Sequence, residues 1–354
     1  MDEKRLRVGF VGVGSMGQMA HLRNYVLLPE CEVVAVAELR KNTGQAVARR
    51  YGIPHWYASA SEMLAAETLD AIVASQPFTR HGIVLAELLA AGVPVFTEKP
   101  LAAGVSTGRQ IANLVGRSGT FVMLGYHKRS DPAVMYAKAK IDELNASGTL
   151  GRMTYVRVLM PAGDWIAGGF DGMVAEQDAP LSLESDTPDP EVDEPARDRY
   201  VSFVNYYIHQ VNLLRHLMGA SYKPVFADAA GVLLVAEAEN GVTGTIEMSP
   251  YRTSIDWQEE ALVCFERGWL RIELPAPVAL NRPGRVTVYS DAGGTPMREE
   301  PTLPWTHAMK QQAQNFLAAV RGERPPMTGV EEGLEDLQVA AEYLKLFEGR
   351  ASCR

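Results

Sequence analysis

The pattern of apolar and polar positions changes once along the chain, near residue 128. Before that point, short apolar runs alternate with stretches that have helical periodicity. The alternation of strand and helix predicts a doubly wound parallel sheet, which binds ligands at the carboxyl ends of its strands. The predicted strands are 6–11, 32–37, 70–74, 93–97 and 120–124, and the predicted helices lie near 16–28, 42–51, 61–66, 80–91 and 104–117.

The second region reads as an α/β arrangement with an antiparallel sheet, because its strand-like runs are separated by turn residues. We therefore expect two domains, 1–127 and 128–354. The second would hold helices near 131–147, 203–218, 306–321 and 331–347, and strand-like runs at 152–160, 225–237, 241–249, 260–266, 269–274 and 285–290.

One polar segment, 168–199, carries many acidic residues and four prolines, so it cannot be a regular helix or strand throughout. Loops of this length inside a domain are often lids, binding loops or disordered segments. Two interpretations stay open for it. It is an ordered loop that contacts substrate or another subunit, or it is an acidic, solvated insertion.

The first strand leads into a glycine pattern, Gly12-x-Gly14-x-x-Gly17. In a dinucleotide site the first glycine allows a tight turn, the second lets backbone approach the pyrophosphate, and the third lets helix pack on strand. Glu38 ends the next apolar run, about where an acid that binds the adenosine ribose is expected. Its carboxylate favours NAD(H) over NADP(H), although Arg40 and Lys41 could bind a 2′-phosphate. The alternative for the whole glycine pattern is a strand-to-helix turn that binds no ligand.

Composition excludes several classes of protein. The net charge of −9 argues against a general binder of nucleic acid or of anionic membranes. Three distant cysteines, Cys31, Cys264 and Cys353, suit a reducing compartment and predict neither a disulfide framework nor a metal site. No apolar stretch is long enough to span a bilayer, and the first strand starts too early to leave room for a signal peptide. We expect a cytoplasmic protein.

Two further segments carry a family resemblance. Residues 92–101 read Gly-Val-Pro-Val-Phe-Thr-Glu-Lys-Pro-Leu and follow Pro77 and His81, and residues 205–219 read Asn-Tyr-Tyr-Ile-His-Gln-Val-Asn-Leu-Leu-Arg-His-Leu-Met-Gly. Together with the glycine pattern they resemble the glucose-fructose oxidoreductase / inositol dehydrogenase / MocA-type (Gfo/Idh/MocA) family. The resemblance implies an N-terminal Rossmann domain and a C-terminal α/β domain with an open, mostly antiparallel sheet. It also implies redox chemistry with NAD, or possibly NADP, on a sugar or cyclic polyol, in homodimers or homotetramers.

The resemblance, with the chemistry of the residues, predicts the catalytic groups. Lys99 ends a predicted strand, where its ammonium can stabilise negative charge on the reacting oxygen, and the Lys99–Pro100 peptide can be cis. His209 can take the proton of a secondary alcohol, and Asn205 is placed one helical turn before it. Each residue also has an interpretation without a catalytic role. Lys99 could be a solvent-exposed lysine at a strand end, and His209 could be a histidine packed in the core.

The sequence departs from the family at two positions. Many members have aspartates four residues before and three residues after this histidine, where the chain has Asn205 and Asn212. An amide can orient a hydroxyl, but it cannot act as a base or carry charge. Either His209 acts as the base with Asn205 orienting it, or the substrate differs from the inositol-type polyols.

The expected contacts follow. We expect the coenzyme to contact Gly12, Gly14, Ser15, Met16, Gly17, Glu38, Gln76, Pro77, His81, Glu98 and Lys99. We expect the substrate to contact Lys99, Tyr126, Lys128, Asp164, Trp165, Asn205 and His209.

The sequence therefore predicts a dehydrogenase that transfers a hydride between a nicotinamide coenzyme and a ring CH–OH or C=O of a sugar, glycoside or cyclic polyol. Two alternatives remain. One is a glycoside hydrolase that oxidises its substrate transiently with a retained NAD, and the other is a non-catalytic regulator that binds a sugar or nucleotide.

Overall fold

The computed structural model describes residues 4–186, 189 and 194–351. The chain forms two compact units: the first contains Met1–Tyr126, Gly168–Glu191 and Gln312–Leu337, and the second contains His127–Ala167, Val192–Gln311 and Gln338–Arg354. Two later segments thus group with the N-terminal unit, whereas the division expected at 127/128 places both of them in the second domain. Cys353 and the prolines at 188 and 190 lie outside the described residues.

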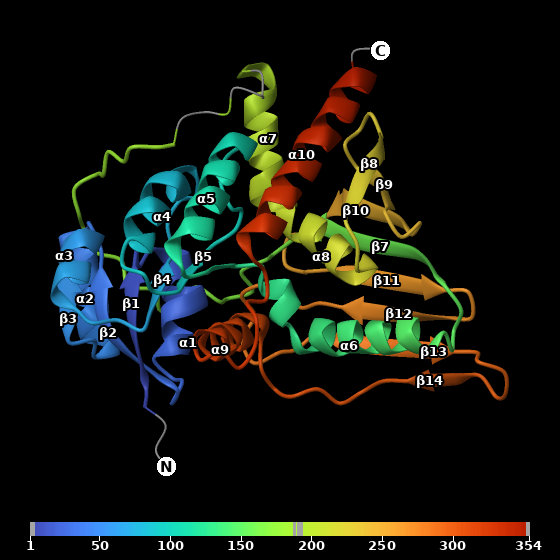
Figure 1. Cartoon of the computed structure of the whole chain (residues 1–354), viewed down its shortest axis with the longest axis horizontal. Coiled ribbons are helices and arrows are strands. Elements are labelled where there is room, and N and C mark those ends of the chain that lie inside the picture. The colour runs from blue at the N-terminus through green and yellow to red at the C-terminus, as the bar shows by residue number, and fades with distance from the viewer. Residues whose placement is uncertain (1–3, 187–188, 190–193, 352–354) are drawn as a thin grey trace. The chain divides into compact units, whose positions relative to one another are not determined.

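The first unit is built on a parallel sheet of six strands in the order β3-β2-β1-β4-β5-β6 (Figure 1). This confirms the predicted doubly wound sheet. The strands are β1 (Leu6–Val11), β2 (Cys31–Ala37), β3 (His55–Tyr57), β4 (Ala71–Ala74), β5 (Val95–Thr97) and β6 (Val122–Leu124). The helices include a π-helical turn, η1 (Gly17–Leu22), with α1 (Arg23–Tyr25), α2 (Lys41–Tyr51), α3 (Ala60–Ala66), α4 (His81–Leu89) and α5 (Val105–Ser118).

A helix from late in the chain, α9 (Ala308–Val320), completes the core of this unit. Its Phe316 is fully buried, with its ring 5.8 Å from that of Phe96 on β5 and 6.2 Å from that of Phe121. Burial of an aromatic ring is worth several kcal/mol. This contact explains why residues 312–337 belong with the sheet.

The second unit contains an open sheet of eight strands in the order β14-β13-β12-β11-β7-β10-β9-β8. Only the β7–β10 pair is parallel, so the predicted open, mostly antiparallel sheet is confirmed. The strands are β7 (Met153–Ala162), β8 (Tyr222–Ala227), β9 (Leu233–Ala238), β10 (Thr243–Arg252), β11 (Glu260–Phe265), β12 (Gly268–Glu273), β13 (Arg285–Ser290) and β14 (Met297–Glu299).

Helices α6 (Pro132–Ser147) and α8 (Ile208–Met218) touch each other and lie against this sheet, α6 on β12 and β13 and α8 on β7 and β10 (Figure 1). The remaining helices of the described residues are η2 (Phe78–Arg80), η3 (His127–Ser130), α7 (Glu194–Tyr206) and α10 (Val330–Ala351). Within the part of the chain that the structure describes, no helix is both long and apolar enough to cross a membrane.

Two predicted elements are corrected. The run 225–237 is two strands, β8 and β9, because a turn intervenes in which Asp228 accepts hydrogen bonds from the backbone of Val232 and Leu233, both at 2.7 Å. The helix predicted near 203–218 is two helices, α7 and α8, which are separated at Tyr207.

Asp131 links two parts of the second unit. It is the N-cap of α6, where its carboxylate accepts from the backbone N–H of Ala133 at 2.8 Å, and it also accepts from the N–H of Gly284 at 3.0 Å. Only 2% of Asp131 is exposed. Burial raises the pKa of this carboxyl to about 6, although the two backbone hydrogen bonds act in the opposite direction.

This pKa predicts a pH-dependent stability. A carboxyl whose pKa is higher in the folded chain than in the unfolded chain stabilises the fold when protonated, and that contribution is lost as the pH rises through the folded value. Relative to Asp131→Asn, the free energy of unfolding of the wild type should fall by roughly 2 kcal/mol between pH 4 and pH 7. Urea unfolding of both proteins across this range measures it, and a difference that does not change with pH would contradict it.

Candidate functional site

The turn after β1 requires its glycines. Gly12 has φ of +89° and donates its N–H to the carbonyl of Ala37 on β2 at 2.8 Å. A Cβ there would lie 2.4 Å from the carbonyl oxygen of Ser75, and a Cβ on Gly17 would lie 2.5 Å from the carbonyl oxygen of Gly12. Gly14 differs, because a Cβ on it would meet only Arg40 Nη2, at 3.7 Å. Its backbone thus faces open space.

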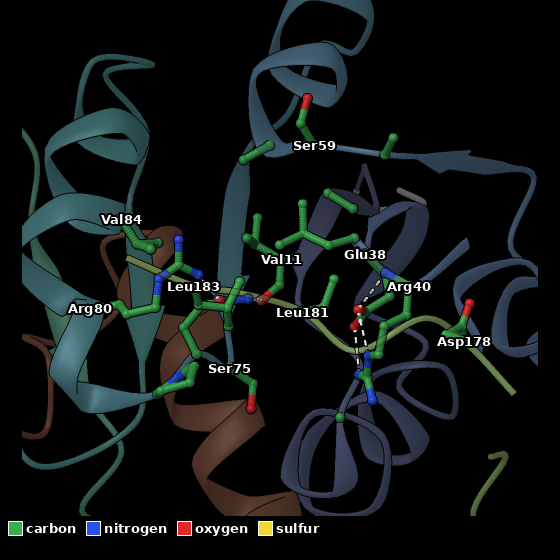
Figure 2. A pocket seen from close by; sticks show the side chains of 18 of the residues that line it. Val11, Glu38, Arg40, Ser59, Ser75, Arg80, Val84, Asp178, Leu181 and Leu183 are labelled. Atoms are coloured by element: carbon green, nitrogen blue, oxygen red, sulfur yellow. Dashed lines mark hydrogen bonds and ion pairs between the residues drawn. The ribbon is translucent and has the colours of Figure 1, made fainter. Parts of the chain in front are cut away.

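That open space is a pocket of about 600 Å³ at the carboxyl ends of β1, β2 and β4 (Figure 2). Figure 2 shows Glu38, Arg40 and Asp178 on one side and Arg80 and Val84 on the other. Of the predicted coenzyme contacts, this pocket is lined by Gly12, Gly14, Glu38, Gln76 and Pro77. Lining residues that the sequence analysis did not name as coenzyme contacts include Ser59, Ser75, Arg80, Asp178, Leu181 and Leu183.

Glu38 is fixed at the pocket edge by hydrogen bonds from Val13 and Arg40. One carboxylate oxygen accepts from the N–H of Val13 at 2.9 Å, and the guanidinium of Arg40 binds both oxygens at 2.9 Å. Burial by itself would raise the pKa of Glu38, but the hydrogen bonds from the Arg40 side chain and from the N–H groups of Val13 and Arg40 hold it below its usual value. Glu38 is therefore ionised at neutral pH and can accept hydrogen bonds from a diol.

The acidic segment 168–199 is tied to the first unit over residues 168–186, which we call the strap (Figure 1). The amide of Gln18 holds it at Val174 through two hydrogen bonds of 3.0 Å. Asp178 accepts from the first turn of α2, and Asp186 accepts from the N–H groups of Gly82 and Ile83 in α4 at 2.9 and 3.1 Å. Beyond the strap, Asp189 accepts from the N–H of Ser106 in α5 at 3.1 Å. The N-termini of three helices of the first unit thus donate hydrogen bonds to aspartates from one segment of the chain.

The Glu98-Lys99-Pro100 motif follows β5, and the Lys99–Pro100 peptide is cis. Glu98 is buried and binds Nε2 of His21 at 2.6 Å. His81 is fully buried, with its ring nitrogens 3.1 Å from the carbonyl of Leu101 and 3.3 Å from that of Gln76. His81 does not line the pocket. Its ring instead connects the chain at Gln76 with the chain at Leu101. Burial lowers the pKa of His81, which keeps the ring neutral.

In the second unit, His209 is half-buried near the start of α8 and forms an edge-to-face contact with His127, with ring centroids 4.5 Å apart. Asn205 is exposed and lies on the other helix, α7. Asn212 is 1% exposed, and its amide oxygen accepts from Nε of Arg129 at 2.6 Å. The amide oxygen of Asn212 therefore helps to hold Arg129 in place.

A buried ion pair lies next to this histidine. The ammonium of Lys128 binds the carboxylate of Glu259, which also accepts from the amide of Gln210 at 2.8 Å. Both charged side chains are almost fully buried. Lys128, predicted as a substrate ligand, thus compensates the buried charge of Glu259.

Glu259 lines a second pocket, of about 300 Å³, that belongs wholly to the second unit. Of the residues expected to contact the substrate, Asp164 lines this pocket, whereas Trp165 and Tyr126 do not. Trp257 lines it as well. Polar and aromatic lining residues of this pocket include Asp164, Trp257, Glu260, Glu273, Arg282 and Arg285. Among the described residues, no group of three histidines, cysteines or acids is placed to hold a metal ion.

The glycine turn gives a matched pair of variants. In Gly14→Ala the methyl group enters open pocket space, so the free energy of unfolding should change by less than about 1 kcal/mol while dinucleotide affinity falls tenfold or more. In Gly12→Ala the positive φ and the contact with Ser75 should destabilise the unit by about 1–3 kcal/mol. Urea unfolding and calorimetric titration with NAD⁺ separate the two effects. Unchanged affinity in Gly14→Ala would contradict this placement of the coenzyme.

Comparison with known proteins agrees with this geometry. The sequence profile of the GFO_IDH_MocA oxidoreductase family, NAD-binding Rossmann fold, matches residues 6–126. Scyllo-inositol 2-dehydrogenase (NAD(+)) of Bacillus subtilis is 26% identical over 267 residues, 71% of this chain and 69% of that protein. Inositol 2-dehydrogenase of Rhizobium meliloti is 22% identical over 351 residues, 95% and 94% of the two chains.

A solved oxidoreductase from Desulfitobacterium hafniense, described as NADPH-dependent, has the same fold with a TM-score of 0.77. The two chains are 13% identical, and the match covers 98% of this chain and 96% of that one. The profile match identifies residues 6–126 as the NAD-binding Rossmann domain of the Gfo/Idh/MocA oxidoreductase family, and inositol dehydrogenases align with most of the chain.

Proposed function

We propose that the protein is an NAD(H)-dependent dehydrogenase that oxidises a ring CH–OH of a cyclic polyol, sugar or glycoside to a ketone, reversibly. The observation that carries this proposal is the 600 Å³ pocket at the carboxyl ends of parallel strands, with Gly14 open on one wall and ionised Glu38 on another. That combination fits a pyrophosphate beside backbone N–H groups and a ribose beside a carboxylate.

The residues of the pocket also fit the coenzyme in detail. The helical residues begin at Ser15, and Gly14 before them, whose carbonyl accepts from the N–H of Gln18 at 2.9 Å, has no side chain to cap the helix, so the helix can offer its first N–H groups to an anion. Glu38 can accept from both ribose hydroxyls of NAD(H) while its bond to Val13 keeps it in place. Exposed Ser15 and half-buried Met16 border this turn.

The chain's own residues would stabilise charge on the substrate oxygen and accept its proton. Bound NAD⁺ would supply the hydride acceptor. Lys99 would hydrogen-bond the substrate oxygen and stabilise its negative charge, and His209 would take the hydroxyl proton. Asn205 would orient a substrate hydroxyl or His209 without accepting a proton itself.

The 300 Å³ pocket of the second unit supports a polyhydroxylated substrate. Asp164, Glu260 and Glu273 offer carboxylate acceptors to hydroxyl groups, and Trp257 offers an indole to the apolar side of a ring. The names of the inositol dehydrogenase relatives point to the same substrate class.

We also propose that the protein assembles into a homodimer or homotetramer through the eight-stranded sheet. Leu262, Trp269 and Tyr289 are half-buried on strands whose alternate residues, such as Val263, are fully buried. The rings of Trp269 and Tyr289 stack with centroids 5.8 Å apart. An aromatic, partly covered sheet face is typical of an interface.

The first test follows absorbance of reduced nicotinamide when the protein meets NAD⁺ and a panel of inositols, sugars and glycosides. The wild type should turn over at least one polyol, and Lys99→Met should lower kcat by about 100-fold or more. An unchanged kcat in Lys99→Met would contradict the role of Lys99. Glycoside cleavage without accumulation of reduced coenzyme would instead identify the redox-assisted hydrolase, and coenzyme binding without either reaction would identify the regulator.

Restoring a carboxylate at position 205 tests the proton path. Asn205→Asp adds a group that can accept a proton near His209, so the pH dependence of kcat should shift while NAD⁺ affinity stays the same. Asn205→Ser is the matched control, because it keeps a polar side chain without a titratable group. If the pH profile of Asn205→Asp equals that of the wild type, Asn205 has no place in the mechanism.

A further inference from the structure

We propose that Asp178 of the strap makes the coenzyme pocket select NAD(H) against NADP(H), by occupying the anion site that a 2′-phosphate would need. This inference rests on the proposed function to the extent that the pocket binds a pyridine dinucleotide. It assigns coenzyme choice to a segment that lies more than 130 residues from the glycine turn and from Glu38 in the sequence.

The first step is the geometry at the start of α2. The carboxylate of Asp178 accepts from the N–H of Asn42 at 2.8 Å, from the N–H of Thr43 at 3.0 Å and from the hydroxyl of Thr43 at 2.7 Å. The amide of Asn42 donates to the carbonyl of Gln177 at 2.7 Å, which fixes the strap beside the helix. Asp178 thus takes the donors that a helix N-terminus would offer to a phosphate.

The second step concerns Arg40, the cation that could receive a 2′-phosphate. Its guanidinium is bound by both oxygens of Glu38, and it is also attracted by the charge of Asp178. The hydrogen bonds with Glu38 raise the pKa of Arg40 against the opposing effect of burial, and the charges of Glu38 and then of Asp178 raise it further. Arg40 and Asp178 both line the pocket, on the same side as Glu38 (Figure 2).

The consequence is electrostatic. Glu38 and Asp178 put two carboxylates on the same side of the pocket as the guanidinium of Arg40, and Glu176 also lines the pocket. A 2′-phosphate would add about two negative charges there and would find both of its natural partners, Arg40 and the α2 N-terminus, already engaged. NAD(H), whose 2′ position is a hydroxyl, leaves these contacts intact. A single acid at the end of β2 is the usual device for this choice, and here the strap supplies a second one.

The experiment compares Asp178→Asn with Asp186→Asn. Both remove one charge from the same strap and one cap from a helix, but only Asp178 lines the pocket. Dissociation constants are measured by calorimetry for NAD⁺ and NADP⁺, and for AMP and adenosine 2′,5′-bisphosphate, which isolate the adenosine half. The wild type should bind NAD⁺ at least tenfold more tightly than NADP⁺. Asp178→Asn should improve binding of NADP⁺ and of the bisphosphate about tenfold, or about 1.4 kcal/mol, with NAD⁺ and AMP within about threefold.

Two further variants keep the test decisive. Asp178→Ser retains a side chain that can cap α2 without charge, so it should shift the coenzyme ratio like Asp178→Asn even where that variant folds poorly. Adding Arg40→Ala to either variant should remove the gain for NADP⁺. An unchanged ratio in both Asp178 variants with NAD⁺ binding intact, an equal shift in Asp186→Asn, or a wild type that prefers NADP⁺ would each overturn the inference. A wild type that binds neither coenzyme would overturn the proposed function itself, and this inference with it.

Discussion

The structure of the first unit depends on which groups accept hydrogen bonds from the N–H groups at the N-termini of its helices. A doubly wound parallel sheet brings these ends, with their unpaired N–H groups and partial positive charge, to the carboxyl edge of the strands. Asp178, Asp186 and Asp189 bind the N-termini of α2, α4 and α5. The turn after β1, which only glycine can form, leads to the helix that lacks a capping side chain at its N-cap. The N–H groups of that helix can therefore be offered to an anion.

The two units differ in the residues that line their pockets, and these residues suit different ligands. The first unit presents an ionised Glu38 and an open glycine backbone, which suit a dinucleotide, and it carries Lys99 at the end of β5. The second unit carries His209 and a pocket rich in carboxylates, which suits hydroxyl groups. Within it, a buried lysine is committed to a buried glutamate, as the Lys128–Glu259 pair shows. A charge so deeply buried is kept only with its partner, so that pair is part of the scaffold.

Local sequence signals predicted most of the fold and part of the site. The apolar run before Gly12, the spacing to Glu38 and the cis Lys99–Pro100 peptide each depend on neighbouring residues, and the structure agrees with them. The strand β3 was missed because three residues carry too little periodicity. The role of Asp178 could not be predicted, because its partners in α2 lie more than 130 residues away in the sequence. Likewise, the hydrogen bond of Asn212 joins it to Arg129, which lies in another element.

A crystal structure of the protein with NAD⁺ tests the central claim most directly, since that claim places the adenosine ribose in the pocket between the glycine turn and Glu38. The account predicts that both ribose hydroxyls lie within hydrogen-bond distance of the Glu38 carboxylate, that the pyrophosphate lies over Gly14, and that Asp178 still accepts from Asn42 and Thr43. A ribose bound away from Glu38, or a strap displaced from α2 to admit the coenzyme, would contradict it.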